Sequence, residues 1–124
     1  MNKTLVLSSL AHTWIIDIDG TICVHNGYKS GEDKLLGGVK DFFSQIPAED
    51  MIIILTSRKA EDEDKLRFFL HKNELRFDHI IFDAPMGERI LINDEKPSGL
   101  NMAYAISKKR DDNLNLNICI DESL

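Results

Sequence analysis

The stretch that decides the fold is WIIDIDGTIC, Trp14 to Cys23. An apolar run ends in two aspartates that are two residues apart, and a Gly-Thr pair follows. Burying a carboxylate among isoleucines costs free energy unless the charge is paired or lies where the strand ends. The run therefore predicts a buried strand over residues 13–18 that carries Asp17 and Asp19 to its carboxyl end.

Apolar runs that are typical of strands alternate with helical patterns along the rest of the chain. Further strands are expected at residues 51–55, 79–82, 89–92 and 116–120, and helices at 38–46, 60–75 and 98–110. The run MIIIL lacks polar alternation, as in a strand covered on both faces. This order predicts a three-layer α/β/α, Rossmann-like domain with a parallel central sheet.

Length and charge limit the choice of class. The chain has 124 residues, which suits a single domain over 1–124. Its net charge of −6 argues against a nucleic-acid partner, and no apolar run is long enough to predict a membrane span. The first eleven residues resemble a weak signal peptide, but a first strand or an ordered lead-in is the preferred interpretation.

The two cysteines give an expectation about the compartment. Cys23 and Cys119 lie far apart, each in an apolar run, and neither belongs to a CxxC pair. We expect two buried free thiols and a reducing compartment, that is, a cytoplasmic protein.

Polar groups follow three of the expected strands. Asp17 and Asp19 end the first, residues 56–58 (Thr-Ser-Arg) follow MIIIL, and residues 93–95 (Asn-Asp-Glu) follow RILI. In open α/β sheets ligands bind beyond the carboxyl ends of the strands. Carboxylates from two strands suit Mg²⁺, and a hydroxyl with backbone N–H groups suits phosphate.

Each of these segments also has a purely structural interpretation. DIDGT is a good turn, TSR a good helix N-cap, and NDEKP an ordinary loop. Structural and functional roles can coexist at one position. The occurrence of all three in chain order, each after an apolar strand, favours the functional interpretation.

These residues resemble the haloacid dehalogenase superfamily over roughly residues 13–97. DIDGTI is similar to its DxDGT first motif, IIILTSR to its second and ILINDE to its fourth. The resemblance implies a phosphatase-like member of that fold that needs Mg²⁺. Asp17 would be the nucleophile and Asp19 the general acid and base.

The resemblance also implies the ligands of the metal and of the phosphate. Asp17 (side chain), Asp19 (backbone carbonyl) and Asp94 would hold Mg²⁺, and Thr56 and Ser57 would bind phosphoryl oxygens.

The chain departs from the family at the third motif, where a lysine is normal. The matching place carries Ala84 and Pro85, and the segment before Asp94 has no lysine. Arg89 is the candidate that would bind phosphate instead, although it would also suit an ordinary surface ion pair. Lys72 is a second candidate.

The spacing leaves no room for a cap domain between the motifs. A polar loop at residues 23–34 would form a small flap, with His25, Tyr28 and Lys29 either near the substrate or at a solvated hairpin tip. Capless relatives act on large substrates or close the site with a neighbouring subunit, so a homo-oligomer is one expectation.

The expected function is hydrolysis of a phosphomonoester through an aspartyl-phosphate. The preferred substrate is a sugar phosphate or a related small metabolite. Two alternatives stay open: a weakly active or inactive binding module on the same fold, and a phosphatase that acts on a macromolecule.

Overall fold

The runs TWII and MIIIL lie side by side as parallel strands in the computed structural model, which describes residues 2–29 and 31–124. They form β2 (Thr13–Ile16) and β3 (Met51–Leu55), and β4 (His79–Ile81) pairs with the other edge of β3. Ile16 pairs with Ile54 in the register. Because parallel strands run in the same direction, the residues that follow β2 and β3 emerge at one edge of the sheet.

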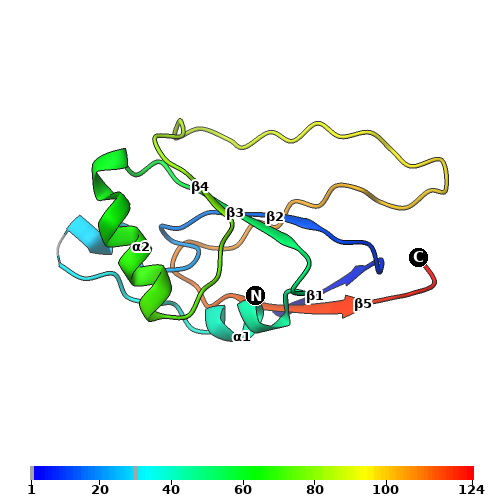
Figure 1. The fold of residues 1–124 in the computed structure, drawn as a ribbon, viewed down its shortest axis with the longest axis horizontal. Helices are drawn as coiled ribbons and strands as arrows, with labels where there is room; N and C mark the ends of the chain where they lie inside the picture. Colours follow the sequence, from blue (N-terminus) through cyan, green and yellow to red (C-terminus); the bar gives the residue numbers. More distant parts are fainter. Residues whose placement is uncertain (1, 30) are drawn as a thin grey trace.

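A second parallel pair joins the two ends of the chain (Figure 1). β1 (Asn2–Leu7) runs beside β5 (Asn115–Ile120), with Asn2 opposite Asn115 and Leu7 opposite Ile120. The prediction of a first strand is confirmed. The prediction of a single central sheet is wrong, because within the described residues the strands form two separate sheets. The chain is thus a small α/β domain with parallel strands in two sheets.

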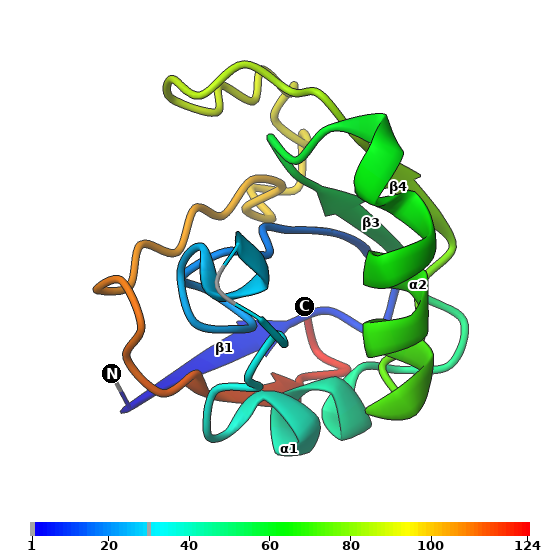
Figure 2. The same cartoon turned by 90° about the vertical axis from the view of Figure 1, so that its left-hand side faces the viewer.

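Two α-helices follow the predicted patterns. α1 (Val39–Gln45) packs against β5, and α2 (Glu63–Lys72) follows the short 3₁₀ turn η2 (Ala60–Asp62). Figure 2 shows α1 beside the β1–β5 pair and α2 on the side of β3 and β4. No helix in the described part of the chain is long and apolar enough to cross a membrane.

One hydrophobic core joins both sheets and both helices. Ile18, Ile52 and Ile54 are fully buried, together with Leu66 and Leu70 on the inner face of α2. Burial of each such side chain stabilises the fold by roughly 1.5–3 kcal/mol. The core therefore fixes the carboxyl ends of β2 and β3 on a rigid base.

The strand predicted at 89–92 and the helix predicted at 98–110 are not formed. Residues 83–113 instead make an extended arm along one side of the molecule (Figure 1). The side chains of Ile90 and Ile92 are 83% and 91% exposed. Gly99 has a φ of +88°, which lies outside the helical range at what would be the first turn of the helix. Apolar spacing predicts a buried face only where a partner surface exists, and Ile90 and Ile92 are exposed in the arm, although Ile106 packs against the core.

A polar cluster ties the start of the sheet together at the edge opposite the candidate site. Asp50 is only 3% exposed, and its carboxylate accepts hydrogen bonds from the His12 N–H (2.9 Å) and from Trp14 Nε1 (2.9 Å). His12 Nδ1 lies 2.8 Å from the same carboxylate, and His12 Nε2 lies 3.0 Å from the Ser8 carbonyl oxygen. Burial alone would raise the pKa of Asp50, but the hydrogen bonds from Trp14 and His12 together lower it.

Candidate functional site

The DIDGT segment forms a tight turn directly after β2. The Thr21 and Ile22 N–H groups donate to the Ile18 carbonyl oxygen at 3.1 and 2.9 Å. Gly20 has a φ of +82°, and a Cβ there would lie 3.0 Å from Arg110 Cγ. Glycine suits this position because other residues rarely adopt that conformation. The turn interpretation is confirmed, and the same turn presents Asp17 and Asp19 at the strand end.

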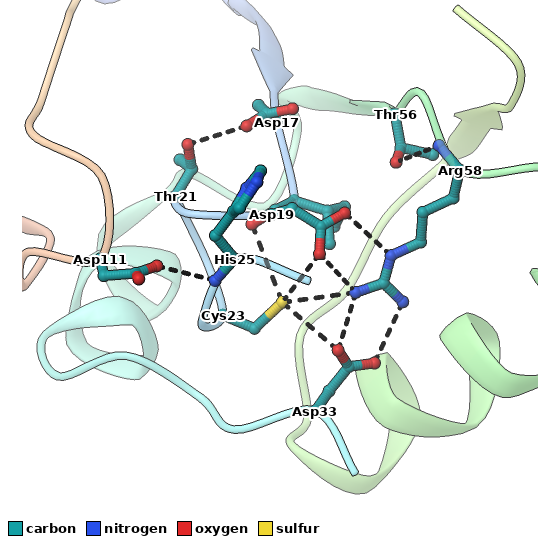
Figure 3. A network of polar contacts seen from close by, with 10 residues as sticks. Asp17, Asp19, Thr21, Cys23, His25, Asp33, Thr56, Arg58 and Asp111 are labelled. Atoms are coloured by element: carbon teal, nitrogen blue, oxygen red, sulfur yellow. Dashed lines mark hydrogen bonds and ion pairs between the residues drawn. The ribbon is translucent and has the colours of Figure 1, made fainter. Parts of the chain in front are cut away.

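Asp17 is open to solvent at this edge. Thr21 Oγ1 donates to Asp17 Oδ2 at 3.0 Å (Figure 3). The surrounding protein removes enough water to raise the pKa of Asp17, and the nearby Asp19 charge raises it further. Hydrogen bonds from Thr21 and the Ile18 backbone, together with the charge of Arg89, act in the opposite direction. Asp17 is therefore an accessible carboxylate whose charged form is kept at some cost.

Asp19 is held by a buried arginine that also holds an acid of the flap. Arg58 Nη2 and Nε donate to the two oxygens of Asp19 at 2.8 and 3.0 Å. Arg58 Nη2 and Nη1 donate to the two oxygens of Asp33 at 2.7 and 3.0 Å. The side chains of Arg58 and Asp33 are 1% and 3% exposed, and that of Asp19 is 16% exposed. Figure 3 shows the guanidinium between the two carboxylates.

The described part of the flap, residues 23–29 and 31–34, folds over this ion pair. The Val24 N–H donates to the Lys34 carbonyl oxygen at 3.0 Å. The Tyr28 ring lies 3.9 Å from Arg58 Cζ, a cation–π contact that covers the guanidinium. Tyr28 thus packs on Arg58, and removal from water raises the pKa of the Tyr28 hydroxyl.

Cys23, the first residue of the flap, is a buried thiol. Its Sγ is 3.7 Å from Asp33 Oδ1, and Arg58 Nη2 is 3.6 Å from that sulfur. Burial and then the Asp33 charge raise the pKa of the thiol well above its ordinary range. Cys23 is buried as expected, whereas Cys119 is exposed, so the expectation of two buried thiols is half right.

One cluster of ligating side chains lies at this site, and it is not the set expected for magnesium. Among the described residues, one group of three ligating side chains, Asp19, Cys23 and Asp33, has ligand atoms within 4.8 Å of one another. The Arg58 guanidinium already neutralises that group, and a thiol is a poor ligand for Mg²⁺. Asp94 lies exposed on the arm, where its N–H contacts Asn93 Oδ1 at 3.0 Å. The group of Asp19, Cys23 and Asp33 is therefore a poor magnesium site, and magnesium binding by Asp17, the Asp19 carbonyl and Asp94 stays a prediction.

Thr56 and Ser57 follow β3 at the same edge of the sheet as Asp17, and Arg89 lies close enough for its charge to act on Asp17. Thr56 is buried, and its Oγ1 accepts the Arg58 N–H at 3.1 Å. Arg89 Nη2 donates to Ser57 Oγ at 3.3 Å, and Arg89 also donates to the Pro85 and Gly87 carbonyl oxygens. The charge of Arg89 acts on Asp17 even though Arg89 belongs to the arm.

A second cation reaches the site from the far end of the arm. Lys108 Nζ donates to the Gly20 carbonyl oxygen at 2.6 Å. Removal from water lowers the pKa of Lys108. The negative charges of three acids, which include Asp17, act in the opposite direction and raise it. Asp111 anchors this part of the arm, since its Oδ1 accepts the His25 N–H at 2.7 Å. Lys72, the other cation considered, lies exposed at the C-terminal end of α2.

Two hollows of about 510 and 410 Å³ lie near the C-terminal end of α2 and beside α1. No candidate site residue lines either of them.

Arg58, Asp33 and Lys108 are site residues that the sequence did not single out. A signal existed for Arg58, because an arginine that directly follows a buried strand needs a carboxylate partner. No comparable signal marks Lys108, which is separated from Asp17 by most of the chain. Comparison of the chain with models of known protein families, with curated proteins and with solved structures finds no match.

Proposed function

We propose that this chain is a phosphomonoester hydrolase in which the Asp17 carboxylate attacks phosphorus. The observation that carries the proposal is an accessible carboxylate at the end of β2, with a second acid two residues later. Two cations, Arg89 and Lys108, lie close enough for their charges to act on Asp17. Positive charge around a carboxylate nucleophile offsets its repulsion of a phosphate dianion.

In the first half of the reaction, a carboxylate oxygen of Asp17 forms a bond to phosphorus and the bond from phosphorus to the alcohol oxygen breaks. Asp19 is the general acid that gives a proton to that leaving oxygen. The products are the free alcohol and an aspartyl-phosphate on Asp17.

In the second half, water attacks the phosphorus of the aspartyl-phosphate and Asp19 takes one proton from that water. The bond between phosphorus and Asp17 breaks, inorganic phosphate leaves, and both aspartates return to their starting forms. The net reaction is hydrolysis of a phosphate monoester to an alcohol and phosphate. A bound Mg²⁺ would be held by Asp17, the Asp19 backbone carbonyl and Asp94, and it would offset the negative charge of the phosphate.

The test is a turnover assay on a panel of small phosphate esters, with sugar phosphates as the preferred class. Each ester is assayed with Mg²⁺ and with a chelator, and acid-quenched protein is examined by mass spectrometry for the aspartyl-phosphate. A phosphorylated oligonucleotide is included in the panel. We expect little turnover of it, because the protein has a net charge of −6 and would repel a polyanion. Absence of turnover and of phosphoenzyme across the panel would refute the proposal.

Replacement of Lys108 by Met should raise the KM for a phosphate ester about tenfold, because loss of one nearby charge costs about 1.4 kcal/mol. Arg89→Met should have an effect of the same sign. Lys72→Met is the control, since Lys72 is exposed at the end of α2. Steady-state kinetics measure all three, and an unchanged KM in both test variants would remove these cations from the site.

A phosphate-binding module is the second candidate function. The observation in its favour is that Asp94 lies on the exposed arm and that Arg58 engages both oxygens of Asp19. Calorimetry with inorganic phosphate separates the two candidates. Binding without turnover of any panel member favours the module, and turnover favours the hydrolase.

A further inference from the structure

We infer that Arg58 is a positioning residue that holds Asp19 as the general base for hydrolysis of the aspartyl-phosphate. The inference rests on the proposed function and concerns its second half. Arg58 donates to both oxygens of Asp19 and to both oxygens of Asp33. A fork that donates in pairs fixes the plane of each carboxylate as well as its position.

The burial of Arg58 argues against direct contact with substrate. Its side chain is 1% exposed, and the Tyr28 ring covers the guanidinium at 3.9 Å. Both Nη atoms and Nε already donate to carboxylates. An arginine that binds a phosphate ester needs N–H groups that point to solvent, and this guanidinium is buried with all three nitrogens already donating. Arg58 can therefore influence the reaction only through the groups that it holds.

Asp19 is the partner that reaches the site. Its side chain is 16% exposed, whereas that of Asp33 is 3% exposed. Asp33 belongs to the flap and serves as the second anchor of Arg58. Asp33 thus holds the Arg58 guanidinium from the buried side, and Arg58 holds the partly exposed carboxylate of Asp19 near Asp17.

The ion pair matches the state of Asp19 after the first half of the reaction. Asp19 has then given its proton to the leaving oxygen and is a carboxylate, the form that pairs with a guanidinium. The next event is removal of a proton from water by this same carboxylate. Correct placement of a general base contributes about 10²–10⁴-fold to a rate. Loss of Arg58 should therefore slow the second half of the reaction more than the first.

This assignment has a kinetic signature. When hydrolysis of a covalent intermediate becomes slow, kcat and KM fall together, while kcat/KM still reports formation of the intermediate. We expect Arg58→Met to lower kcat about 10²-fold. The value of kcat/KM should change far less, and the aspartyl-phosphate should accumulate during turnover. Arg58→Lys, which keeps the charge but loses the fork, should recover part of the rate.

Two further variants complete the experiment. Asp33→Asn removes the second anchor while Arg58 stays, so it should give a smaller change of the same kind. Arg67→Lys is the matched control, because Arg67 lies half exposed on α2 and pairs with Glu63 at 2.7 Å. Near-ultraviolet circular dichroism and Trp14 fluorescence check the fold of every variant. If Arg58→Met does not fold, Arg58→Lys and Asp33→Asn carry the test.

Several results would overturn the assignment. A raised KM with unchanged kcat would make Arg58 a direct substrate ligand. If kcat/KM falls and no phosphoenzyme accumulates, Arg58 acts on the first half of the reaction or on the fold. If the kinetics of the Arg58 variants are unchanged, Arg58 has no role in the reaction. The proposed function fails separately, since that failure is the absence of turnover in the unaltered protein.

Discussion

Replacing Asp17 by Asn is expected to lower turnover by at least about 10³-fold and to raise the unfolding temperature at neutral pH. The loss of activity follows because an amide does not form the aspartyl-phosphate. The gain in stability follows from the raised pKa of Asp17, which shows that the folded chain keeps this carboxylate charged at a cost. Active sites commonly carry such a cost.

The pH dependence of this gain has a definite sign. Because the pKa of Asp17 is higher in the folded than in the unfolded chain, its contribution to stability falls as the pH rises from the ordinary aspartate pKa through the raised one. The advantage of Asp17→Asn should therefore be full above the raised pKa. It should vanish below the ordinary aspartate range.

Thermal melts followed by circular dichroism at neutral and at acidic pH measure both parts of the prediction. Glu122→Gln, which removes an exposed carboxylate after β5, is the control. Retained activity in Asp17→Asn would exclude the aspartyl-phosphate. A lower unfolding temperature at neutral pH would show that the Asp17 charge supports the fold.

Replacing Asp50 by Ala is expected to cost about 3 kcal/mol of stability, since it removes the charged acceptor of a buried cluster. Trp14 Nε1 and the His12 N–H would lose their acceptor in a part of the fold that contains little water. The connection from β1 to β2 would also lose its link to the start of β3. The whole sheet should therefore unfold at lower denaturant.

Urea unfolding followed by Trp14 fluorescence measures this loss, and Glu49→Ala is the control because Glu49 is the exposed neighbour. The pKa of Asp50 is lowered in the folded chain, so its contribution is present above the ordinary aspartate pKa. It is lost as the pH falls through the lowered pKa. A variant that unfolds at the same urea concentration as the unaltered protein would contradict the argument.

The sequence predicts most of the core because burial and periodicity follow directly from residue type. Leu66 and Leu70 lie on the inner face of α2 as their spacing indicates, and Ile52 and Ile54 are buried in β3. Residues 89–92 also contain an apolar run, Ile-Leu-Ile, yet this segment forms no strand. A pattern shows what a segment would bury, while the presence of a partner depends on the rest of the fold.

The candidate site is predictable only in part, for a similar reason. Asp17 and Asp19 were placed correctly because they directly follow a strand that the core fixes. The pairing of Asp19 with Arg58 and Asp33 depends on how the flap folds back, and no local spacing records that. The position of Lys108 depends on the path of the whole arm. Contacts across such separations are a property of the tertiary structure.

The pairing of β1 with β5 has a consequence for how the chain reaches this structure. The register joins Asn2 to Asn115, so β1 cannot pair until the residues of β5 are available. Contacts between residues so far apart slow folding because a large loop must close before they form. β2, β3 and α2 can assemble earlier, while β1 stays unpaired. The pairing of β1 with β5 should therefore be a late event in folding.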